Sequence, residues 1–142
     1  HSRVARSDVL AFSALGARVL LVGPRTFMPP STEGWPVEVV HDLDQVLGEM
    51  DVVYLLRIQQ ERIAGARIPS LREYSAGFAL SAERARRMRK DAVVLHPGPM
   101  NRGVEIAAEV ADLPSSMITA QVRNGVAVRM AVLFRLLGGE LD

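Results

Sequence analysis

The segment that decides the fold reads ARVLLVGP at residues 17–24. A short, almost continuous apolar run that ends at a Gly-Pro turn signal is typical of a strand buried on both faces of a parallel sheet. Three similar runs follow, at residues 37–40, 51–56 and 92–95. The sequence therefore predicts four buried strands.

Segments with helical spacing lie between and around these runs. Val9, Phe12 and neighbouring apolar residues precede the first strand, and residues 43–47 follow Asp42, a good helix N-cap. Further helices are expected at residues 81–89, 104–111 and 124–137. This alternation predicts an α/β fold, a doubly wound parallel sheet with helices on both faces. Because a doubly wound domain normally starts on a strand and this chain starts on a helix, we expect that further sequence preceded it.

The composition indicates an ordinary globular domain. Of the 142 residues, 49% are hydrophobic and 23% are charged, which favours one folded core. The net charge of +1 argues against binding to nucleic acid, and no apolar run has the length of a membrane span. The absence of cysteine excludes disulfides and thiolate metal sites and fits a reducing compartment. We expect a cytoplasmic protein that binds neither membrane nor nucleic acid.

Positive charge is concentrated in residues 81–90, where four arginines and a lysine outnumber Glu83. A basic helix of this kind is usually a solvated face. The alternative is a contact surface for another protein.

Two loops at strand ends carry the residues of greatest chemical interest, because ligands of open α/β sheets bind outside the carboxyl ends of the strands. The first loop is RIQQER at residues 57–62. Arg57 and Gln59 would project to the same side, where a guanidinium can bind a carboxylate or phosphate. Glu61 is near enough in sequence to orient Arg57. The alternative is a cluster of surface salt bridges.

The second loop is HPGPMNRG at residues 96–103. Two prolines around one glycine remove backbone donors and stiffen the turn, so the carbonyls of Pro97 and Gly98 are expected to face outward as acceptors for an NH₂ group. We predict a cis peptide bond before Pro99. The alternative is an ordinary Pro/Gly loop, and His96 alone is more often a hydrogen-bonded structural residue than a ligand.

Motifs for other chemistries are missing from the sequence. The three histidines have no metal-site spacing, and neither a dinucleotide-binding glycine motif, a P-loop nor a nucleophile elbow is present. We therefore assign no metal and no cofactor.

Four blocks together resemble the aspartate carbamoyltransferases. They are HSRVARS at residues 1–7, RIQQER at 57–62, HPGPMNRG at 96–103 and QVRNGVAVRMA at 121–131. The resemblance covers essentially the whole chain, in the order of the family. It implies a single aspartate-binding domain, residues 1–142, of a chain that normally has two domains.

The resemblance also implies a reaction and a set of site residues. In this family the α-amine of L-aspartate attacks the carbonyl carbon of carbamoyl phosphate, which gives N-carbamoyl-L-aspartate for pyrimidine synthesis. Carried over by motif, Arg3, Arg57 and Gln59 bind L-aspartate, with Glu61 orienting Arg57. The turn formed by Pro97, Gly98 and Pro99 receives the carbamoyl group through its carbonyls. No covalent catalytic residue, metal or cofactor is implied.

The family's carbamoyl-phosphate domain has no counterpart in these residues, and family sites are completed by a neighbouring subunit of a homotrimer. We therefore expect the chain alone to be inactive and to bind aspartate weakly. An ornithine carbamoyltransferase is the nearest rival, but its turn typically carries a Cys, which this chain lacks. A non-catalytic binding or assembly module is the rival from another class.

Overall fold

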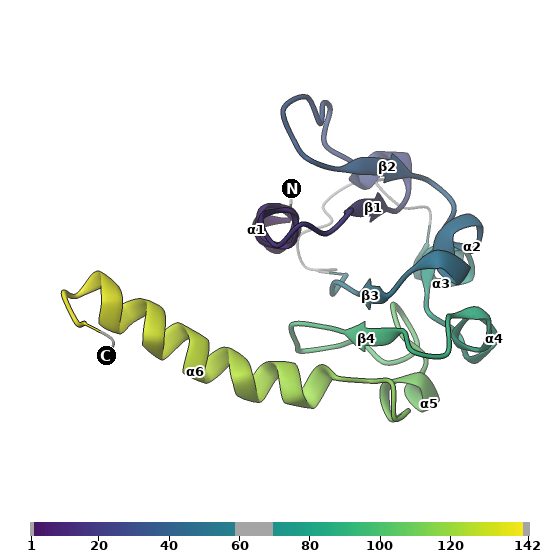
Figure 1. The fold of residues 1–142 in the computed structure, drawn as a ribbon. Coiled ribbons are helices and arrows are strands. Elements are labelled where there is room, and N and C mark those ends of the chain that lie inside the picture. The colour runs from purple at the N-terminus through teal and green to yellow at the C-terminus, as the bar shows by residue number, and fades with distance from the viewer. Residues whose placement is uncertain (1, 59–69, 141–142) are drawn as a thin grey trace.

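The computed structural model describes residues 2–58 and 70–140 as alternating helices and strands (Figure 1). In chain order the elements are α1 (Arg3–Ala14), β1 (Leu20–Val22), the 3-10 helix η1 (Arg25–Phe27), β2 (Glu38–Val40), α2 (Leu43–Val46), η2 (Leu47–Glu49), β3 (Val52–Tyr54), α3 (Leu71–Phe78), α4 (Ala82–Arg87), β4 (Val93–Leu95), α5 (Ala108–Ala111) and α6 (Ile118–Leu136). A helical element lies between every two successive strands, and the sequence predicted those between the second and third and between the third and fourth strands but not η1.

All four predicted strands are present and pair in parallel, which confirms the α/β class with parallel strands. β1 pairs with β2, and β3 pairs with β4. Among the described residues the strands pair two by two, in two short sheets. Tyr54 lies opposite Leu95 in the second sheet. The carboxyl ends of β3 and β4 are therefore adjacent, and the segments that begin at Arg57 and His96 start side by side.

The core surrounds the β3–β4 sheet. In Figure 1, α2, α3 and α4 lie together on one side of the strands and α1 lies on the other. One cluster of buried apolar residues joins α2, η2, both strands of this sheet, α5 and the start of α6: Leu43, Leu47, Val53, Leu80, Val94, Ile106, Val110 and Ile118. Each such side chain stabilises the fold by about 1.5–3 kcal/mol through its removal from water. The cluster fixes β4, and with it the start of the loop at residues 96–103.

Three helices differ from the sequence prediction. No helix was predicted at α3, which starts where the Ser70 hydroxyl accepts a hydrogen bond from the Glu73 N–H. The helix expected at residues 104–111 begins only at Ala108, because the preceding residues pair with Leu80 instead. The Leu80 N–H donates to the Glu105 carbonyl, and the Ala107 N–H donates to the Leu80 carbonyl. The last helix starts at Ile118, earlier than residue 124.

The basic segment at residues 81–90 is only partly a solvated face. Arg84 and Arg87 both bind the Asp44 carboxylate of α2, and the Arg84 side chain is only 12% exposed. Arg89 contacts Asp51 and Asp91. Three of the five cations therefore have acidic partners.

The last helix, α6, extends away from the rest of the described chain (Figure 1). Its start is anchored by Ile118, which is 4% exposed, whereas its later apolar residues lie largely in solvent. Within the described residues, no helix combines the length and hydropathy needed to cross a membrane.

Candidate functional site

A cavity of about 600 Å³ brings together the described residues of the predicted site. Arg3, Arg57 and the three residues Pro97, Gly98 and Pro99 all line it. They come from three parts of the chain: the first turn of α1, the segment after β3 and the turn after β4. Gln59 and Glu61 lie outside the described residues, so their predicted roles stay predictions.

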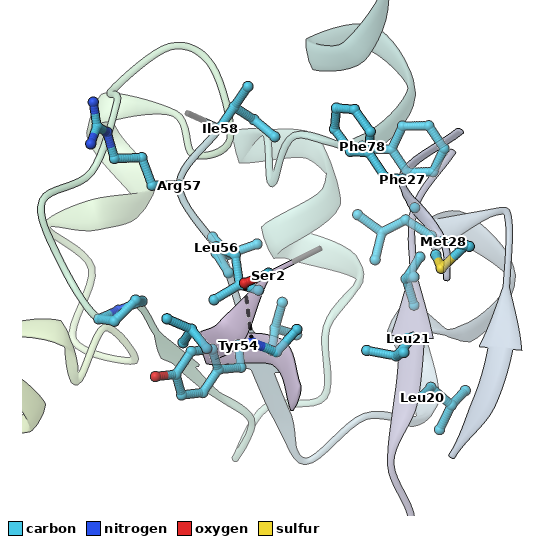
Figure 2. A pocket seen from close by; sticks show the side chains of 18 of the residues that line it. Ser2, Leu20, Leu21, Phe27, Met28, Tyr54, Leu56, Arg57, Ile58 and Phe78 are labelled. Carbon is cyan, nitrogen blue, oxygen red and sulfur yellow. Dashed lines mark hydrogen bonds between the residues drawn. The ribbon is translucent and has the colours of Figure 1, made fainter. Parts of the chain in front are cut away.

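Most of the cavity wall is apolar. Figure 2 shows Leu20, Leu21, Phe27, Met28 and Phe78 on one side of the cavity, and Arg57 on the other with its guanidinium directed away from them. Arg57 is half-buried and Arg3 is exposed. The cavity thus has an apolar side and a cationic rim, and the guanidinium groups of the rim are of the kind that bind a carboxylate or phosphate.

Aromatic side chains stiffen the apolar side. The Tyr74 ring centroid lies 6.0 Å from that of Phe27 and 5.7 Å from that of Phe78. Burial, together with the charge of Glu105, raises the pKa of Tyr74 to about 12. Tyr74 is therefore a neutral hydroxyl at physiological pH.

The two strand-end loops are held against each other. The Leu55 N–H donates to the Leu95 carbonyl at 2.9 Å, which continues the ladder one residue beyond β3. The Asn101 side-chain amide then donates to the Ile58 carbonyl at 3.1 Å. Arg57 lies between these two bonds in sequence. Its backbone is therefore fixed relative to the turn at residues 97–99.

The turn has the predicted cis bond between Gly98 and Pro99, which is confirmed. Gly98 adopts a φ of 66°, a left-handed conformation that glycine adopts without steric cost. Its N–H donates to Nδ1 of His96 at 2.9 Å. The turn is thus held from within its own loop, and His96 is a hydrogen-bonded residue, as one reading of the sequence expected.

Behind the turn lies a buried pair, His96 and Glu105, which are 0% and 1% exposed. His96 Nε2 lies 3.2 Å from Glu105 Oε1, which also accepts from the Asn101 N–H at 2.6 Å. Burial is the largest single influence and acts to raise the pKa of Glu105, but the hydrogen bonds from His96 and Asn101, together with smaller electrostatic and backbone contributions, lower the pKa below its ordinary value. Glu105 is therefore a carboxylate that ties β4, the turn and Asn101 together.

A second set of hydrogen bonds connects the turn to α1 and α6. Gln121, near the start of α6, accepts from the His96 N–H at 2.9 Å and donates to the Tyr54 hydroxyl at 2.9 Å. Burial raises the pKa of Asp8, and a hydrogen bond from Tyr54 opposes this effect. Burial and the charge of Asp8 raise the pKa of Tyr54. Helix α1, which carries Arg3, thus meets β3 and α6 behind the site.

Sequence reasoning missed several of these supporting residues. Asn101 and Gln121 lie inside the blocks that carried the resemblance, but no role was assigned to them. Glu105 was placed in a predicted helix. A signal for it was present, because Val104, Glu105 and Ile106 alternate apolar and acidic, which is typical of extended chain.

Comparison with known proteins gives one family. The family model described as "Aspartate/ornithine carbamoyltransferase, Asp/Orn binding domain" matches residues 1–136. The aspartate carbamoyltransferase catalytic subunit of Thermobifida fusca is 56% identical over 141 residues, which is 99% of this chain and 45% of the relative. That of Acidothermus cellulolyticus is 57% identical over 98% of this chain and 43% of the relative. The chain therefore spans less than half the length of the curated relatives it matches.

Solved structures agree with this result. The aspartate transcarbamoylase of Trypanosoma cruzi, in complex with carbamoyl phosphate and aspartate, matches with a TM-score of 0.66 and 30% identity, over 82% of this chain and 40% of that one. The ornithine carbamoyltransferase of Pyrococcus furiosus matches with a TM-score of 0.80 over 96% of this chain and 47% of that one. At 24% identity, the second match bears on the fold alone.

Proposed function

The chain belongs to the Asp/Orn-binding domain family of the aspartate/ornithine carbamoyltransferases, and we propose on that premise that it forms the aspartate-binding half of an aspartate carbamoyltransferase. The reaction joins the α-amine of L-aspartate to the carbonyl carbon of carbamoyl phosphate. A C–N bond forms, the bond from that carbon to the phosphate oxygen breaks, and the amine loses a proton. The products are N-carbamoyl-L-aspartate and phosphate, an early step of pyrimidine synthesis.

One observation carries the proposal: a single cavity of about 600 Å³ is lined by Arg3, Arg57 and the turn at residues 97–99. In the proposed site, Arg3 and Arg57 bind the aspartate carboxylates and Gln59 helps to position aspartate. The carbonyls of Pro97 and Gly98, in the turn closed by Pro99, accept hydrogen bonds from the carbamoyl NH₂. Glu61 orients Arg57.

The physical basis is positioning and charge placement. Aspartate and carbamoyl phosphate are both anionic and repel each other, so arginine side chains in the site lower the free energy needed to bring them together. The half-buried Arg57 is well suited to this task, because its charge is less screened than that of an exposed side chain. The mechanism needs no covalent intermediate, metal or cofactor.

Aspartate is favoured over ornithine as the acceptor. The similar curated relatives, at 56% and 57% identity, are aspartate carbamoyltransferases. A cationic ornithine side chain would be repelled by Arg57 and Arg3 at the cavity rim. The chain also lacks the cysteine typical of the ornithine family's turn.

The assembly is part of the proposal. The Thermobifida fusca relative is more than twice as long as the matched region, and we expect the 142-residue chain by itself to lack part of the substrate contacts. We expect the full-length protein to be a cytoplasmic homotrimer that binds neither nucleic acid nor membrane. The rival reading, an assembly module with residues 81–90 as its contact surface, is weakened because Arg84, Arg87 and Arg89 already have acidic partners.

A chimaera tests the proposal. This chain replaces the matching 45% of the Thermobifida fusca subunit, which supplies the remaining length. The chimaera should form N-carbamoyl-L-aspartate, and the 142-residue chain alone should not. In the chimaera, Arg57→Ala should lower kcat/KM for aspartate by roughly 10- to 100-fold, which corresponds to lost hydrogen bonds to a charged group.

Arg86→Ala is the matched control, because Arg86 is exposed on α4 outside the cavity. Arg86→Ala should leave kcat and KM for aspartate unchanged. An inactive chimaera that folds and assembles would contradict the proposal, and equal effects of the two substitutions would contradict the role of Arg57.

A further inference from the structure

The backbone of the carbamoyl-facing turn is held by a side chain that does not line the cavity. His96 is fully buried and is absent from the cavity wall, whereas the next three residues line it. Its Nδ1 accepts the hydrogen bond from the Gly98 N–H at 2.9 Å. The peptide that carries this N–H also carries the Pro97 carbonyl. The direction of that carbonyl is therefore coupled to the position of the imidazole ring.

The hydrogen-bond partners assign the tautomer of His96. Because a backbone N–H can only donate, Nδ1 must be the unprotonated nitrogen. The proton then lies on Nε2, which points at Glu105 Oε1 at 3.2 Å. A carboxylate accepts this proton well, so Glu105 fixes both the tautomer and the orientation of the ring.

Two further bonds hold this arrangement in place. The Gln121 side chain accepts from the His96 N–H at 2.9 Å, and Glu105 Oε1 accepts from the Asn101 N–H at 2.6 Å. The imidazole is thus fixed at its backbone and at both ring nitrogens. A ring held at three points restricts the turn more than a loop of Pro and Gly alone.

We propose that His96 is a positioning residue of the carbamoyl site: it aims the Pro97 carbonyl by holding the Gly98 N–H, and Glu105 supports it from behind. This inference rests on the proposed function. A carbonyl that is displaced by about 1 Å can cost on the order of 100-fold in rate, because catalysis here depends on the placement of the reacting groups.

Two substitutions of His96 test its two ring hydrogen bonds one at a time, the one with the Gly98 N–H and the one with Glu105. The Gln side chain of His96→Gln reaches the position of Nε2 and keeps a donor for Glu105, but it loses the acceptor for the Gly98 N–H. The Asn side chain of His96→Asn places its oxygen at the position of Nδ1 and keeps that acceptor. It is combined with Glu105→Gln, which avoids a buried carboxylate that has lost its side-chain donor and keeps only the Asn101 N–H. Glu105→Gln alone is the baseline for the double variant.

The readout is steady-state kinetics in the chimaera, with thermal unfolding of every variant. His96→Gln should lower kcat by roughly 10- to 100-fold and raise KM for carbamoyl phosphate, with KM for aspartate little changed. The double variant should keep the kinetic constants of Glu105→Gln. If His96 had a purely structural role, His96→Gln and the double variant would both lose activity in proportion to their loss of stability. The change in kcat would then not be separated from the changes in the two KM values.

The outcomes are distinct. An inactive unsubstituted chimaera removes the proposed function and this inference together. If the chimaera is active but His96→Gln retains full kcat, or both variants fall equally, the inference alone is wrong. Should the variants fail to fold, hydrogen exchange of the Gly98 amide in the unsubstituted chimaera decides: slowed exchange supports the inference, and exchange at the open-chain rate overturns it.

Discussion

Glu105 shows how one buried charge organises the site. Its side chain is 1% exposed, and two donors, the His96 ring and the Asn101 N–H, meet on one carboxylate oxygen. Its other oxygen has no hydrogen-bond partner in the described part of the chain. A buried carboxylate is costly unless it is hydrogen-bonded, so removing either donor should be more damaging than an average substitution.

Glu105 should make stability depend on pH. Folding lowers the pKa of Glu105 below its ordinary value of 4.5, so the unfolded state takes up a proton first as the pH falls. The stabilisation is complete above about pH 4.5 and is lost as the pH falls through the folded pKa. Glu105→Gln should therefore lower the free energy of unfolding by about 1–3 kcal/mol at pH 7 and flatten its decline below pH 4.5.

Urea unfolding at a series of pH values measures this effect. Glu109→Gln is the control, because Glu109 is an exposed carboxylate on α5 of the same charge. Its variant should keep the pH profile of the unsubstituted chain. A Glu105→Gln profile as steep as that of the control would contradict the assignment.

The sequence could identify the residues that line the cavity but not those that support them. Arg57 and the turn at residues 97–99 directly follow strands, and the ends of adjacent parallel strands meet at one edge. Gln121 is different, because it lies 67 residues from Tyr54 along the chain, and only the folded structure brings them within 2.9 Å. Contacts of this range leave no local pattern to read.

At the scale of elements, α2 and α4 are joined by one carboxylate. Asp44 binds Arg84, whose side chain is 12% exposed, and it also contacts Arg87 and lies in the first turn of α2. The hydrogen bond from Arg84, followed by the charges of Arg84 and Arg87, lowers the pKa of Asp44. The pairing orients α4 and gives two of its arginines an acidic partner, whereas on a fully solvated helix they would be hydrated by water.

Asp44→Asn should weaken the α2–α4 junction, and the size of this loss should depend on the salt concentration. The carboxylate is 34% exposed and partly screened, so the expected loss in unfolding free energy is at most about 1 kcal/mol at low ionic strength. The loss should shrink in 1 M NaCl, because salt weakens the attraction between partly exposed charges and the Debye length falls to about 3 Å. Thermal unfolding at the two salt concentrations measures it.

The Arg102–Asp112 pair provides the control, since its side chains are 45% and 69% exposed. Asp112→Asn should change the unfolding temperature less than Asp44→Asn does. Equal shifts for the two variants would indicate that the α2–α4 junction adds nothing beyond a surface ion pair.

The strands were easier to predict than the helices, for a physical reason. A buried strand such as β4 needs only a short apolar run and a turn, and all four were found. The helix expected at residues 104–111 begins only at Ala108, because Ile106 pairs with Leu80, which lies 26 residues earlier in the chain. Local helix propensity competes there with tertiary pairing, and the pairing determines the structure.

At the scale of the whole molecule, α6 has a surface that the described chain does not cover. Val126, Met130, Leu133 and Leu137 follow one another at helical spacing and are 52%, 65%, 59% and 86% exposed. Soluble monomers rarely expose a continuous apolar patch of this kind. The chain covers 45% of the length of the Thermobifida fusca subunit that it matches.

We expect the 142-residue chain to self-associate through α6. Met130→Glu with Leu133→Glu should weaken this association by at least roughly 10-fold, because each buried Leu or Met contributes about 1.5–3 kcal/mol. The matched control is Leu10→Glu with Leu15→Glu, two leucines of comparable exposure at 58% and 84% but on or beside α1. Sedimentation velocity measures all three proteins. A monomeric unsubstituted chain at tens of micromolar, or equal weakening by both variants, would show that α6 does not drive association.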